Sequence, residues 1–266
     1  MGAKTPRDLT LEQILSFTDD FQVPVFLRMH HNSVNHEAVA KALVWPAISE
    51  EDFSRITQDN IARICHYPEA IPSLNKCDFR GRRCLVVGSS APWLELYLLK
   101  RGADYVHTLE YRPISWTLPP SLENKWGSTV FEELGNRIGD QQAYKIQFNA
   151  VISYSSLEHS GLGRYGDPIN PHGDLETIDQ LLPLVESDAA WYIAVPIGQD
   201  SVLFNRHRVY GRGRISAMAK RLGKKAVTIV HTAMSASESD AFGQGVHDLL
   251  SCPLGTDGIQ RLIIFR

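Results

Sequence analysis

Residues 82–113 read RRCLVVGSSAPWLELYLLKRGADYVHTLEYRP, and this stretch decides the fold of the chain. The apolar run at 84–87 predicts a buried strand, which ends at Gly88 and a short polar turn. Residues 92–100 predict a helix, because a proline stands in the first turn and Gly102 follows the last apolar residues. The stretch therefore opens with a strand, a turn and a helix.

A second apolar run, residues 106–109, predicts another strand, and it ends at Glu110. A crossover between parallel strands brings Glu110 and the start of the helix to the same edge of the sheet. Gly88 permits a tight turn and the close approach of a ligand. Glu110 lies 22 residues after Gly88, near the separation at which an acid accepts hydrogen bonds from ribose hydroxyls. This unit predicts a nucleoside site without choosing the cofactor.

The turn itself favours one cofactor class. Residues 88–95, GSSAPWLE, lack the GxGxxG pattern that lets a backbone approach a dinucleotide pyrophosphate. A sulfonium cofactor carries no phosphate, and Glu95 near the helix start would repel a pyrophosphate while suiting a cationic ligand. The alternative is that Glu95 is only a helix N-terminal acid and Trp93 only core packing. The residues favour a pocket of the S-adenosylmethionine (SAM) type.

Further apolar runs predict the rest of the sheet, at residues 148–152, 191–195, 226–230 and 262–265. Such short and nearly continuous runs are typical of strands buried on both faces of a parallel sheet. Between them we expect a helix at 175–186, with Asp174 as N-cap and Pro183 as a kink, and another at 214–222. Strands that alternate with helices predict an α/β protein with a doubly wound sheet.

Residues 1–78 lack a strong strand pattern, and prolines at 24, 46, 68 and 72 interrupt them. They predict short helices, such as one at 51–66, and we expect a helical extension or lid before a domain at 79–266. Three histidines of this segment are expected at the surface: His30, His31 and His36.

Two loops that leave predicted strand ends carry the candidate catalytic side chains. In residues 149–176, NAVISYSSLEHSGLGRYGDPINPHGDLE, a long polar loop contains His159 and Asp167. His159 could be a general base, since imidazole titrates near neutral pH, or both residues could merely tie the loop down. In residues 195–211, VPIGQDSVLFNRHRVYG, Arg208 could hold a carboxylate or phosphate, or form a structural ion pair.

A divalent metal ion is a weaker alternative for the same loops. Five side chains of these loops offer nitrogen and oxygen ligands: His159, Asp167, His172, Asp174 and His207. The spacing of these residues matches no helix-borne ligand motif. A thiolate zinc site is not expected, because none of the four cysteines, Cys65, Cys77, Cys84 and Cys252, forms a CxxC pair.

Composition limits the class of protein. The 266 residues carry a net charge of −3 and are 43% hydrophobic, as in an ordinary globular protein. We expect no nucleic-acid partner, no membrane partner and a cytoplasmic location, because no basic excess, apolar span or signal pattern is present. The oligomeric state is left open.

The motifs GSSAPWLE (88–95), TLEY (108–111) and YSSLEHSGLGRYGDP (154–168) resemble class I SAM-dependent methyltransferases. More narrowly, residues 155–175 and 205–211 resemble a nematode-type family of unknown function placed near those enzymes. The resemblance runs from about residue 80 to 266. It implies a Rossmann-like methyltransferase fold with a seven-stranded, mostly parallel sheet and an antiparallel last strand. The cofactor-binding residues that it implies are Gly88, Ser89, Ser90, Trp93, Glu95, Glu110, Tyr111, Ser156, Leu157 and Glu158.

The chain departs from the usual methyltransferase motif in two ways. Val86 stands where those enzymes carry an acid, and Ser90 and Pro92 stand where they carry further glycines. Our leading hypothesis is methyl transfer from SAM to an oxygen or nitrogen of a small molecule or glycan. His159 would be the base, and three residues would orient the acceptor: Asp167, His207 and Arg208. The alternatives are a non-catalytic ligand-binding or scaffold protein on a degenerate fold, a nucleotide-dependent oxidoreductase and a metal-dependent hydrolase.

Overall fold

The computed structural model describes residues 9–18, 23–27, 42–57, 60–138, 147–165, 167–224, 226–230 and 258–266. His30, His31, His36 and Cys252 lie outside these ranges. The chain forms two compact units. Unit 1 comprises residues 1–40, 154–182 and 194–266, and unit 2 comprises residues 41–153 and 183–193.

A seven-stranded sheet forms the framework of the fold. Counted along the chain and read from β6, its strands lie in the order 3, 2, 1, 4, 5, 7, 6. β3 pairs in parallel with β4 and β7, β4 pairs in parallel with β6, and β12 runs antiparallel to β11. This is the Rossmann-like methyltransferase fold, so the predicted fold class is confirmed. The strands are β3 (Arg83–Val87), β4 (Tyr105–Glu110), β6 (Trp126–Val130), β7 (Phe148–Tyr154), β8 (Val185–Ile197), β11 (Val227–Val230) and β12 (Ile259–Phe265).

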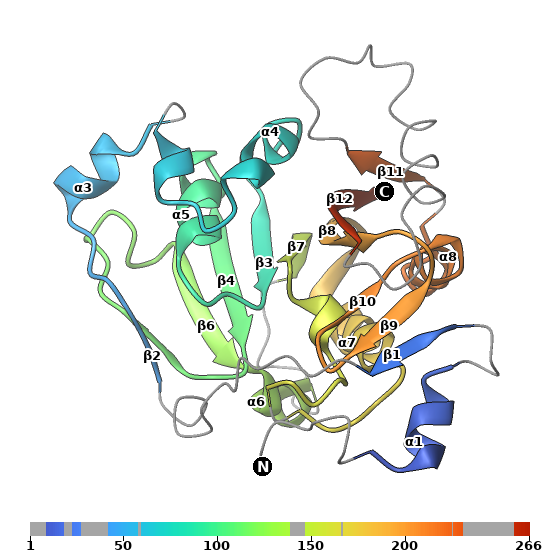
Figure 1. The fold of residues 1–266 in the computed structure, drawn as a ribbon. Helices are drawn as coiled ribbons and strands as arrows, with labels where there is room; N and C mark the ends of the chain where they lie inside the picture. Colours follow the sequence, from blue (N-terminus) through green and yellow to red (C-terminus); the bar gives the residue numbers. More distant parts are fainter. Residues whose placement is uncertain are drawn as a thin grey trace. The chain divides into compact units, whose positions relative to one another are not determined.

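The centre of unit 2 is built from β3, β4 and the helix α5 (Trp93–Lys100), which packs against both strands (Figure 1). Residues 84–87 of β3 are all buried, as their continuous apolar run predicts. α5 is buried from Trp93 to Leu99, so it is a core helix rather than an amphipathic one. The helix also carries one charged side chain into the core, that of Glu95.

The predicted helix at 51–66 is wrong, because the chain breaks it into short pieces. α3 (Glu50–Arg55) begins with a capping box between Ser49 and Asp52. Asn60 then accepts a hydrogen bond from the Thr57 backbone N–H and donates one to the Arg55 carbonyl, which turns the chain out of the helix. Short elements follow, namely the 3-10 turns Ile61–Arg63 and Pro68–Ala70 and the helix α4 (Ile71–Leu74).

Two short strands occur in the N-terminal part of the chain, where the sequence predicts only helices. β1 (Val25–Leu27) pairs with β9 (Ser201–Phe204) in unit 1, and β2 (Leu43–Trp45) pairs in parallel with β5 (Ile114–Trp116) in unit 2. Three residues are too few to show a hydrophobic period. The β2–β5 pair is stabilised by contacts distant in sequence, because the ring of Trp45 lies 5.1 Å from that of Trp116 and 5.8 Å from that of Trp126.

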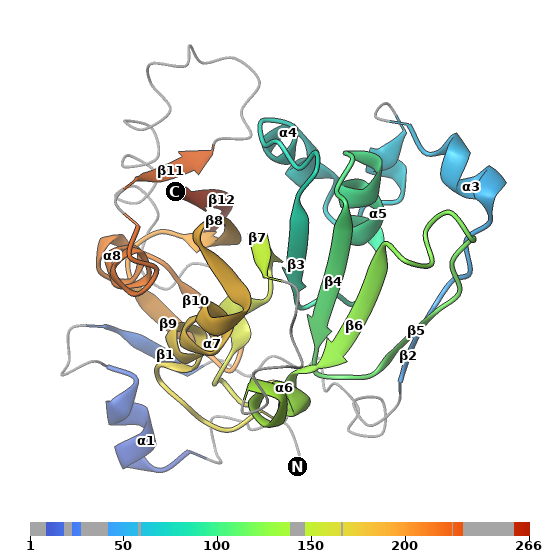
Figure 2. The same cartoon turned by 180° about the vertical axis from the view of Figure 1, so that it is seen from behind.

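Unit 1 contains a small three-stranded sheet of β1, β9 (Ser201–Phe204) and β10 (His207–Val209), and Figure 2 shows it near the helices α7 (Gly173–Leu181) and α8 (Arg212–Arg221). β9 and β10 form an antiparallel hairpin, and β1 adds to β9 in parallel. The sheet contributes to an apolar cluster that also contains the end of α1 (Leu11–Ser16). The buried members are Phe17, Leu162, Val202 and Phe204.

The helix predicted at 175–186 is placed wrongly at both ends. α7 ends at Leu181, and a 3-10 turn over Leu182–Leu184 contains Pro183, which has no N–H to continue the helix. β8 then begins at Val185. Asp174 is not the N-cap, because His172 holds that position and Asp174 lies buried in the first turn. α8 agrees with the predicted helix at 214–222 apart from a start two residues earlier and an end one residue earlier.

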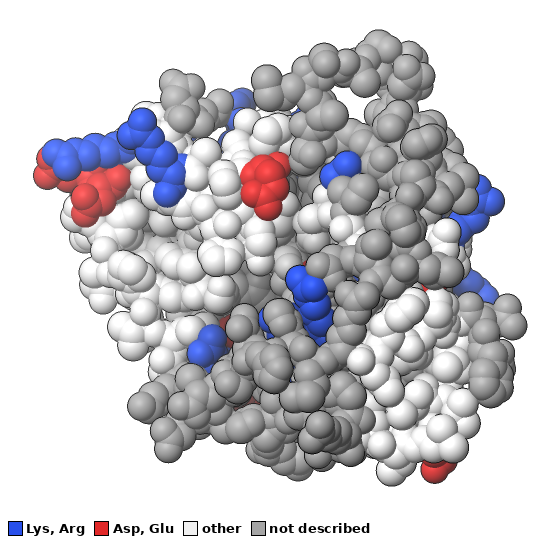
Figure 3. Space-filling view, viewed as in Figure 1, with Lys and Arg blue, Asp and Glu red and all other residues white. Residues whose placement is uncertain are grey.

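Two further features of the described residues concern the helices and the surface charge. None of the described helices is both long and apolar enough to cross a membrane. The remaining helix of unit 2 is α6 (Phe131–Ile138). On the face drawn in Figure 3, acidic and basic side chains meet at α3, where Arg55 pairs with Glu51.

Candidate functional site

The glycine turn after β3 lies against the end of β4, inside unit 2. Val87 is in register with Leu109, and the Gly88 N–H donates to the Leu109 carbonyl at 2.9 Å. Gly88 has a φ of +74°, a left-handed conformation that favours glycine. The next N–H, of Ser89, donates to the Glu110 carboxylate at 2.9 Å. The structure thus brings the turn and Glu110 together, as the crossover argument predicts.

The buried side chain of Glu95 holds this turn in place through hydrogen bonds. Its Oε1 accepts a hydrogen bond from the Thr108 hydroxyl at 2.9 Å, and its Oε2 lies 3.1 Å from the Ser89 hydroxyl. Thr108 in turn accepts from the indole N–H of Trp126 at 3.1 Å. Because Glu95 is 0% exposed and both its oxygens have partners, it supports the turn, a structural role that neither sequence interpretation named. Its direct role toward a ligand stays a prediction.

The protons around Ser89 indicate which form of Glu95 is present. The Ser89 hydroxyl lies 2.9 Å from the Ala91 carbonyl and 3.1 Å from Glu95 Oε2, but it has one proton to donate. A protonated Glu95 resolves this, since it donates to Ser89 while Ser89 donates to Ala91. Burial acts in the same direction, because it raises the pKa of Glu95 to about 7.

Replacing Glu95 with glutamine is expected to change how stability depends on pH. The pKa of Glu95 is raised from 4.5 to about 7 by folding, so the folded state binds more protons between these values and the free energy of unfolding falls as pH rises through them. Above about pH 7 the burial penalty is on the order of 3 kcal/mol. Glutamine can donate to Ser89 and accept from Thr108, so E95Q should gain stability relative to the wild type at pH 8.

Urea unfolding of both proteins at pH 5 and pH 8 checks this result. Glu158 has a pKa raised in the same direction, so the test is the difference between E95Q and the wild type rather than either pH profile alone. A difference that stays constant from pH 5 to pH 8 would show that Glu95 is ionised in the fold throughout.

The other predicted cofactor residues of unit 2 surround the turn. Burial raises the pKa of Glu110, although the Ser89 N–H and Arg112 act in the opposite direction. Tyr111 is exposed and stacks on Phe131 with ring centroids 5.3 Å apart. Ser90 is exposed, whereas Trp93 is buried and its ring lies 6.0 Å from that of Tyr67. Trp93 thus contributes to the core, and its contact with a cofactor stays a prediction.

The long loop of unit 1 is held by Asp167. Its Oδ2 accepts hydrogen bonds from the N–H groups of Gly161 at 2.7 Å and Gly163 at 3.1 Å, and its Oδ1 accepts from Tyr165 at 3.1 Å. Both glycines have a positive φ, of +79° and +68°. Both carboxylate oxygens therefore fix the backbone of the loop, as in the loop-tying alternative, and a role toward an acceptor stays a prediction.

His159 has a defined tautomer. Its Nδ1 lies 2.6 Å from the Arg206 carbonyl, which can only accept, so Nδ1 carries the proton and Nε2 presents a lone pair. Burial lowers the pKa of His159 to about 3, and the nearby charge of Arg164 adds to this effect. The ring packs edge-on against Tyr165 at 5.7 Å and lies 6.3 Å from His207. A neutral, oriented imidazole can accept a proton.

Glu158 is the neighbour of that lone pair. It is 1% exposed, and Oε1 lies 3.8 Å from His159 Nε2. Burial raises the pKa of Glu158 to about 7, against a hydrogen bond from Ser155 and the charge of Arg164. Because His159 is neutral at pH 7, the two side chains do not form an ion pair there. Among the other predicted cofactor residues of unit 1, Leu157 is buried and Ser156 is half-buried.

Arg208 clamps the same loop from β10. It is 0% exposed, and its Nη2 donates to the carbonyls of Asn170 at 3.0 Å and Pro171 at 3.1 Å, while Nη1 donates to that of Ser160. Its Nε faces the buried carboxylate of Asp174 at 3.6 Å. These contacts occupy the guanidinium with the chain itself, so the structural ion pair is present. The acceptor-orienting role of Arg208 stays a prediction.

Asp174 is the centre of a buried charge cluster. It accepts hydrogen bonds from Tyr210 Oη at 2.7 Å and from Arg214 Nε at 2.8 Å, and it pairs with Arg214 Nη2. Burial opposes its ionisation, but Arg208 and Arg214 outweigh that and hold the pKa of Asp174 at about 2. One carboxylate thus faces two guanidinium groups, and the cluster keeps a net positive charge.

Comparison with models of protein families shows which family the chain belongs to. Residues 81–233 match the family described as "Caenorhabditis protein of unknown function, DUF268". The chain belongs to this family. The predicted resemblance to a nematode-type family is therefore confirmed, and the match includes the glycine turn, the Asp167 loop and β10 of this DUF268 member. A search of curated protein sequences finds no match.

Solved structures resemble the DUF268 chain at low identity. A Burkholderia thailandensis 1,6-didemethyltoxoflavin-N1-methyltransferase is 12% identical, with 100% of this chain and 93% of that chain covered and a TM-score of 0.47. A SAM-dependent methyltransferase from Archaeoglobus fulgidus is 13% identical, with 81% and 96% covered and a TM-score of 0.43. One from Mesorhizobium loti is 9% identical, with 74% and 98% covered and a TM-score of 0.41. The fold assignment rests on the strand order and register of the sheet.

Within each unit, the fold of this DUF268 member brings the predicted site residues together. In unit 2 the turn meets Glu110, and in unit 1 His159 lies near His207, while Asp167 and Arg208 hold its loop. The partnership of Asp174 with Arg214 was not predicted, because its signal in the sequence is only a pair of opposite charges at the starts of two helices. Among the described residues, no group of three or more His, Cys, Asp or Glu side chains could hold a metal ion.

Proposed function

We propose that this DUF268 protein transfers a methyl group from SAM to an oxygen or nitrogen of a small molecule or glycan. The observation that carries the proposal is the hydrogen bond between the Ser89 N–H and the Glu110 carboxylate. It holds an acid and a glycine turn at the carboxyl ends of two neighbouring parallel strands, where ligands bind in open α/β sheets.

The residues present fit the nucleoside part of SAM. Backbone N–H groups of Ser89 and Tyr111 hold Glu110, and carboxylate oxygens can each accept further hydrogen bonds, so the ribose hydroxyls have an acceptor. Gly88 carries no side chain in the left-handed turn next to it. Val86 replaces the usual acid inside β3, but Glu95 supports the turn from α5 through Ser89. The departure in sequence is thus accompanied by another support for the turn.

In the proposed reaction, SAM supplies an electrophilic methyl group, and the protein aligns the acceptor and receives its proton. His159 is suited to receive it, because the Arg206 carbonyl fixes its Nδ1 proton and leaves Nε2 as the acceptor. When the methyl group passes from the SAM sulfur to the acceptor oxygen or nitrogen and S-adenosylhomocysteine leaves as a neutral thioether, Nε2 of His159 would receive the proton of the acceptor. A pKa of about 3 makes His159 a weak base, which favours acceptors that lose their proton late in the reaction.

Calorimetry with SAM and S-adenosylhomocysteine tests the proposal, with Glu110→Ala as the decisive variant. Loss of a charged acceptor for the ribose hydroxyls should weaken binding at least about tenfold, since such hydrogen bonds contribute about 1.5–3 kcal/mol each. Glu123→Ala, which removes an exposed acid of the same unit, should bind as the wild type does.

Two results would count against the proposal. Equal affinities of the wild type and E110A would remove Glu110 from the site. Absence of heat and of any thermal shift for the wild type with both compounds would favour the alternative of a non-catalytic scaffold, which the valine at position 86 suggests.

A further inference from the structure

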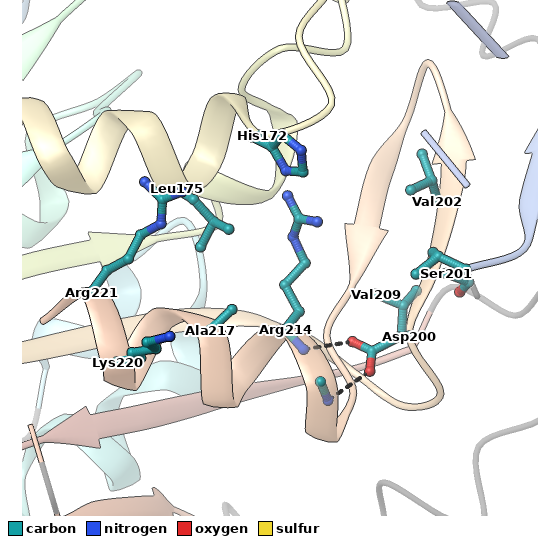
Figure 4. Close-up of a pocket in the computed structure, with 12 residues that line it drawn as sticks. His172, Leu175, Asp200, Ser201, Val202, Val209, Arg214, Ala217, Lys220 and Arg221 are labelled. Atoms are coloured by element: carbon teal, nitrogen blue, oxygen red, sulfur yellow. Dashed lines mark hydrogen bonds between the residues drawn. The ribbon is translucent and has the colours of Figure 1, made fainter. Parts of the chain in front are cut away.

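Unit 1 contains a pocket that the proposed function does not use. Its volume is about 660 Å³, and it lies between α7, α8 and the β9–β10 hairpin (Figure 4). Pockets that bind small molecules usually have volumes of about 300–1,000 Å³. Most of its lining residues come from α8 and the hairpin. The size is therefore suited to a small organic ligand.

One part of the pocket wall is apolar. Val202 and Val209 of the hairpin, Leu175 of α7 and Ala217 of α8 contribute to it, together with Val23. In Figure 4 these side chains come from opposite sides, with the valines on the hairpin and Leu175 and Ala217 on the helices. Such a wall gains free energy by covering an apolar ligand body.

The charged part of the wall is mainly cationic. Arg214, Lys220 and Arg221 line the pocket from α8, and Figure 4 shows His172 and Arg214 pointing toward one another. Arg221 pairs with Asp179, whereas the Lys220 ammonium is exposed and has no partner among the described residues. Arg214 uses Nε and Nη2 on Asp174 and Pro171, and no described residue accepts from its Nη1. Two donors therefore remain for a ligand.

The one acid in the lining does not cancel this charge. Asp200 accepts hydrogen bonds from the N–H groups of Gly211 at 2.6 Å, Gly213 at 2.8 Å and Arg214 at 3.2 Å, so its carboxylate is committed to the start of α8. Behind the wall, Asp174 is shared by Arg208 and Arg214. The pocket therefore faces a net positive charge, with an apolar surface next to it.

We propose that this pocket binds a small organic anion, in which a phosphate or carboxylate head meets Lys220 and Arg214 Nη1 and an apolar body covers the valines of the hairpin. Cationic donors suit such heads because charge-assisted hydrogen bonds are about twice as strong as neutral ones. The apolar wall distinguishes this ligand from a free inorganic ion. Binding here requires neither SAM nor methyl transfer.

Calorimetry on the full chain without SAM tests the proposal, with hexyl phosphate and hexanoate as probes. At least one of them should bind saturably and more tightly, by about tenfold or more, than inorganic phosphate and hexanol, which each offer half of the recognition. Lys220→Gln should weaken the preferred probe about tenfold. Ala217→Leu keeps the charge of the pocket and narrows it, so this variant should also weaken binding of the preferred six-carbon probe.

Arg212→Gln is the matched control, because it removes a cation from the same helix outside the pocket and should leave affinity unchanged. Thermal unfolding shows whether each variant is folded. The proposal is overturned if inorganic phosphate binds as well as hexyl phosphate, if K220Q and R212Q have the same effect, or if neither probe binds. Either preferred head group, phosphate or carboxylate, supports it.

Discussion

Replacing Arg208 with methionine is expected to lower the free energy of unfolding by about 3–5 kcal/mol, the cost of removing one partner of a buried ion pair. Methionine fills part of the volume but donates no hydrogen bond. The Ser160 carbonyl would lose its donor, whereas the Asn170 carbonyl would keep the Gly173 N–H and the Pro171 carbonyl would keep Arg214 Nη2. Asp174 would keep Arg214 and Tyr210, which sets the upper limit of the loss.

Urea unfolding with circular dichroism measures this loss. Arg208→Lys keeps the charge but not the planar fork that reaches separate carbonyls, so it should recover only part of the stability. Arg212→Met, an exposed arginine of α8, should change stability by less than about 0.5 kcal/mol. A loss below about 1 kcal/mol for R208M would contradict the clamp, since removing one partner of a buried ion pair costs several times that much.

Replacing His159 with alanine is expected to reduce the turnover of methyl transfer by about 10²–10⁴-fold, the usual contribution of a positioned base. The loss should fall on kcat, because the side chain meets the acceptor proton rather than the nucleoside. Calorimetry with S-adenosylhomocysteine should give the wild-type affinity. His66→Ala, which removes an exposed histidine of unit 2, should leave turnover unchanged.

The pH profile gives a second test of His159. Its pKa is lowered from 6.5 to about 3 by burial and by Arg164, so the imidazole is neutral throughout the range from pH 5 to pH 9. Titration of His159 should therefore add no rise in turnover near pH 6.5, and any limb near pH 7 should disappear in Glu158→Gln, because the pKa of Glu158 is raised to about 7. Wild-type turnover in H159A would reject the residue as the base, and a limb near pH 6.5 that disappears in H159A would place its pKa near the normal value.

Sequence patterns predict the helices and strands whose structure depends on residues close by in the chain. The runs at 84–87 and 106–109 lie in β3 and β4 because buried parallel strands need continuous apolar residues. β6 was not predicted, since Trp126–Val130 mixes a tryptophan with glycine, serine and threonine. β1 and β2 were missed for another reason: three residues carry no period, and their strand form depends on partners far along the chain.

The contacts of the candidate site were likewise predicted only in part. The meeting of Gly88 and Glu110 follows from a crossover whose geometry is nearly fixed, so the sequence predicts it. The engagement of Arg208 with loop carbonyls does not follow from the motif, because an arginine after a strand end is equally compatible with a ligand contact and with a structural ion pair. Asp174 likewise has the residue type of an N-cap, and only the packing of α7 and α8 turns it inward.

The parallel pairing of β1 with β9 also affects the order in which unit 1 folds. Val25 of β1 is in register with Val202 of β9, so about two thirds of the chain separates two strands that lie side by side. A growing chain that emerges from the ribosome must leave residues 25–27 unpaired until the hairpin has been synthesised. Contacts so distant in sequence form slowly, so the three-stranded sheet should close late, and its completion should limit the rate at which the newly made protein matures.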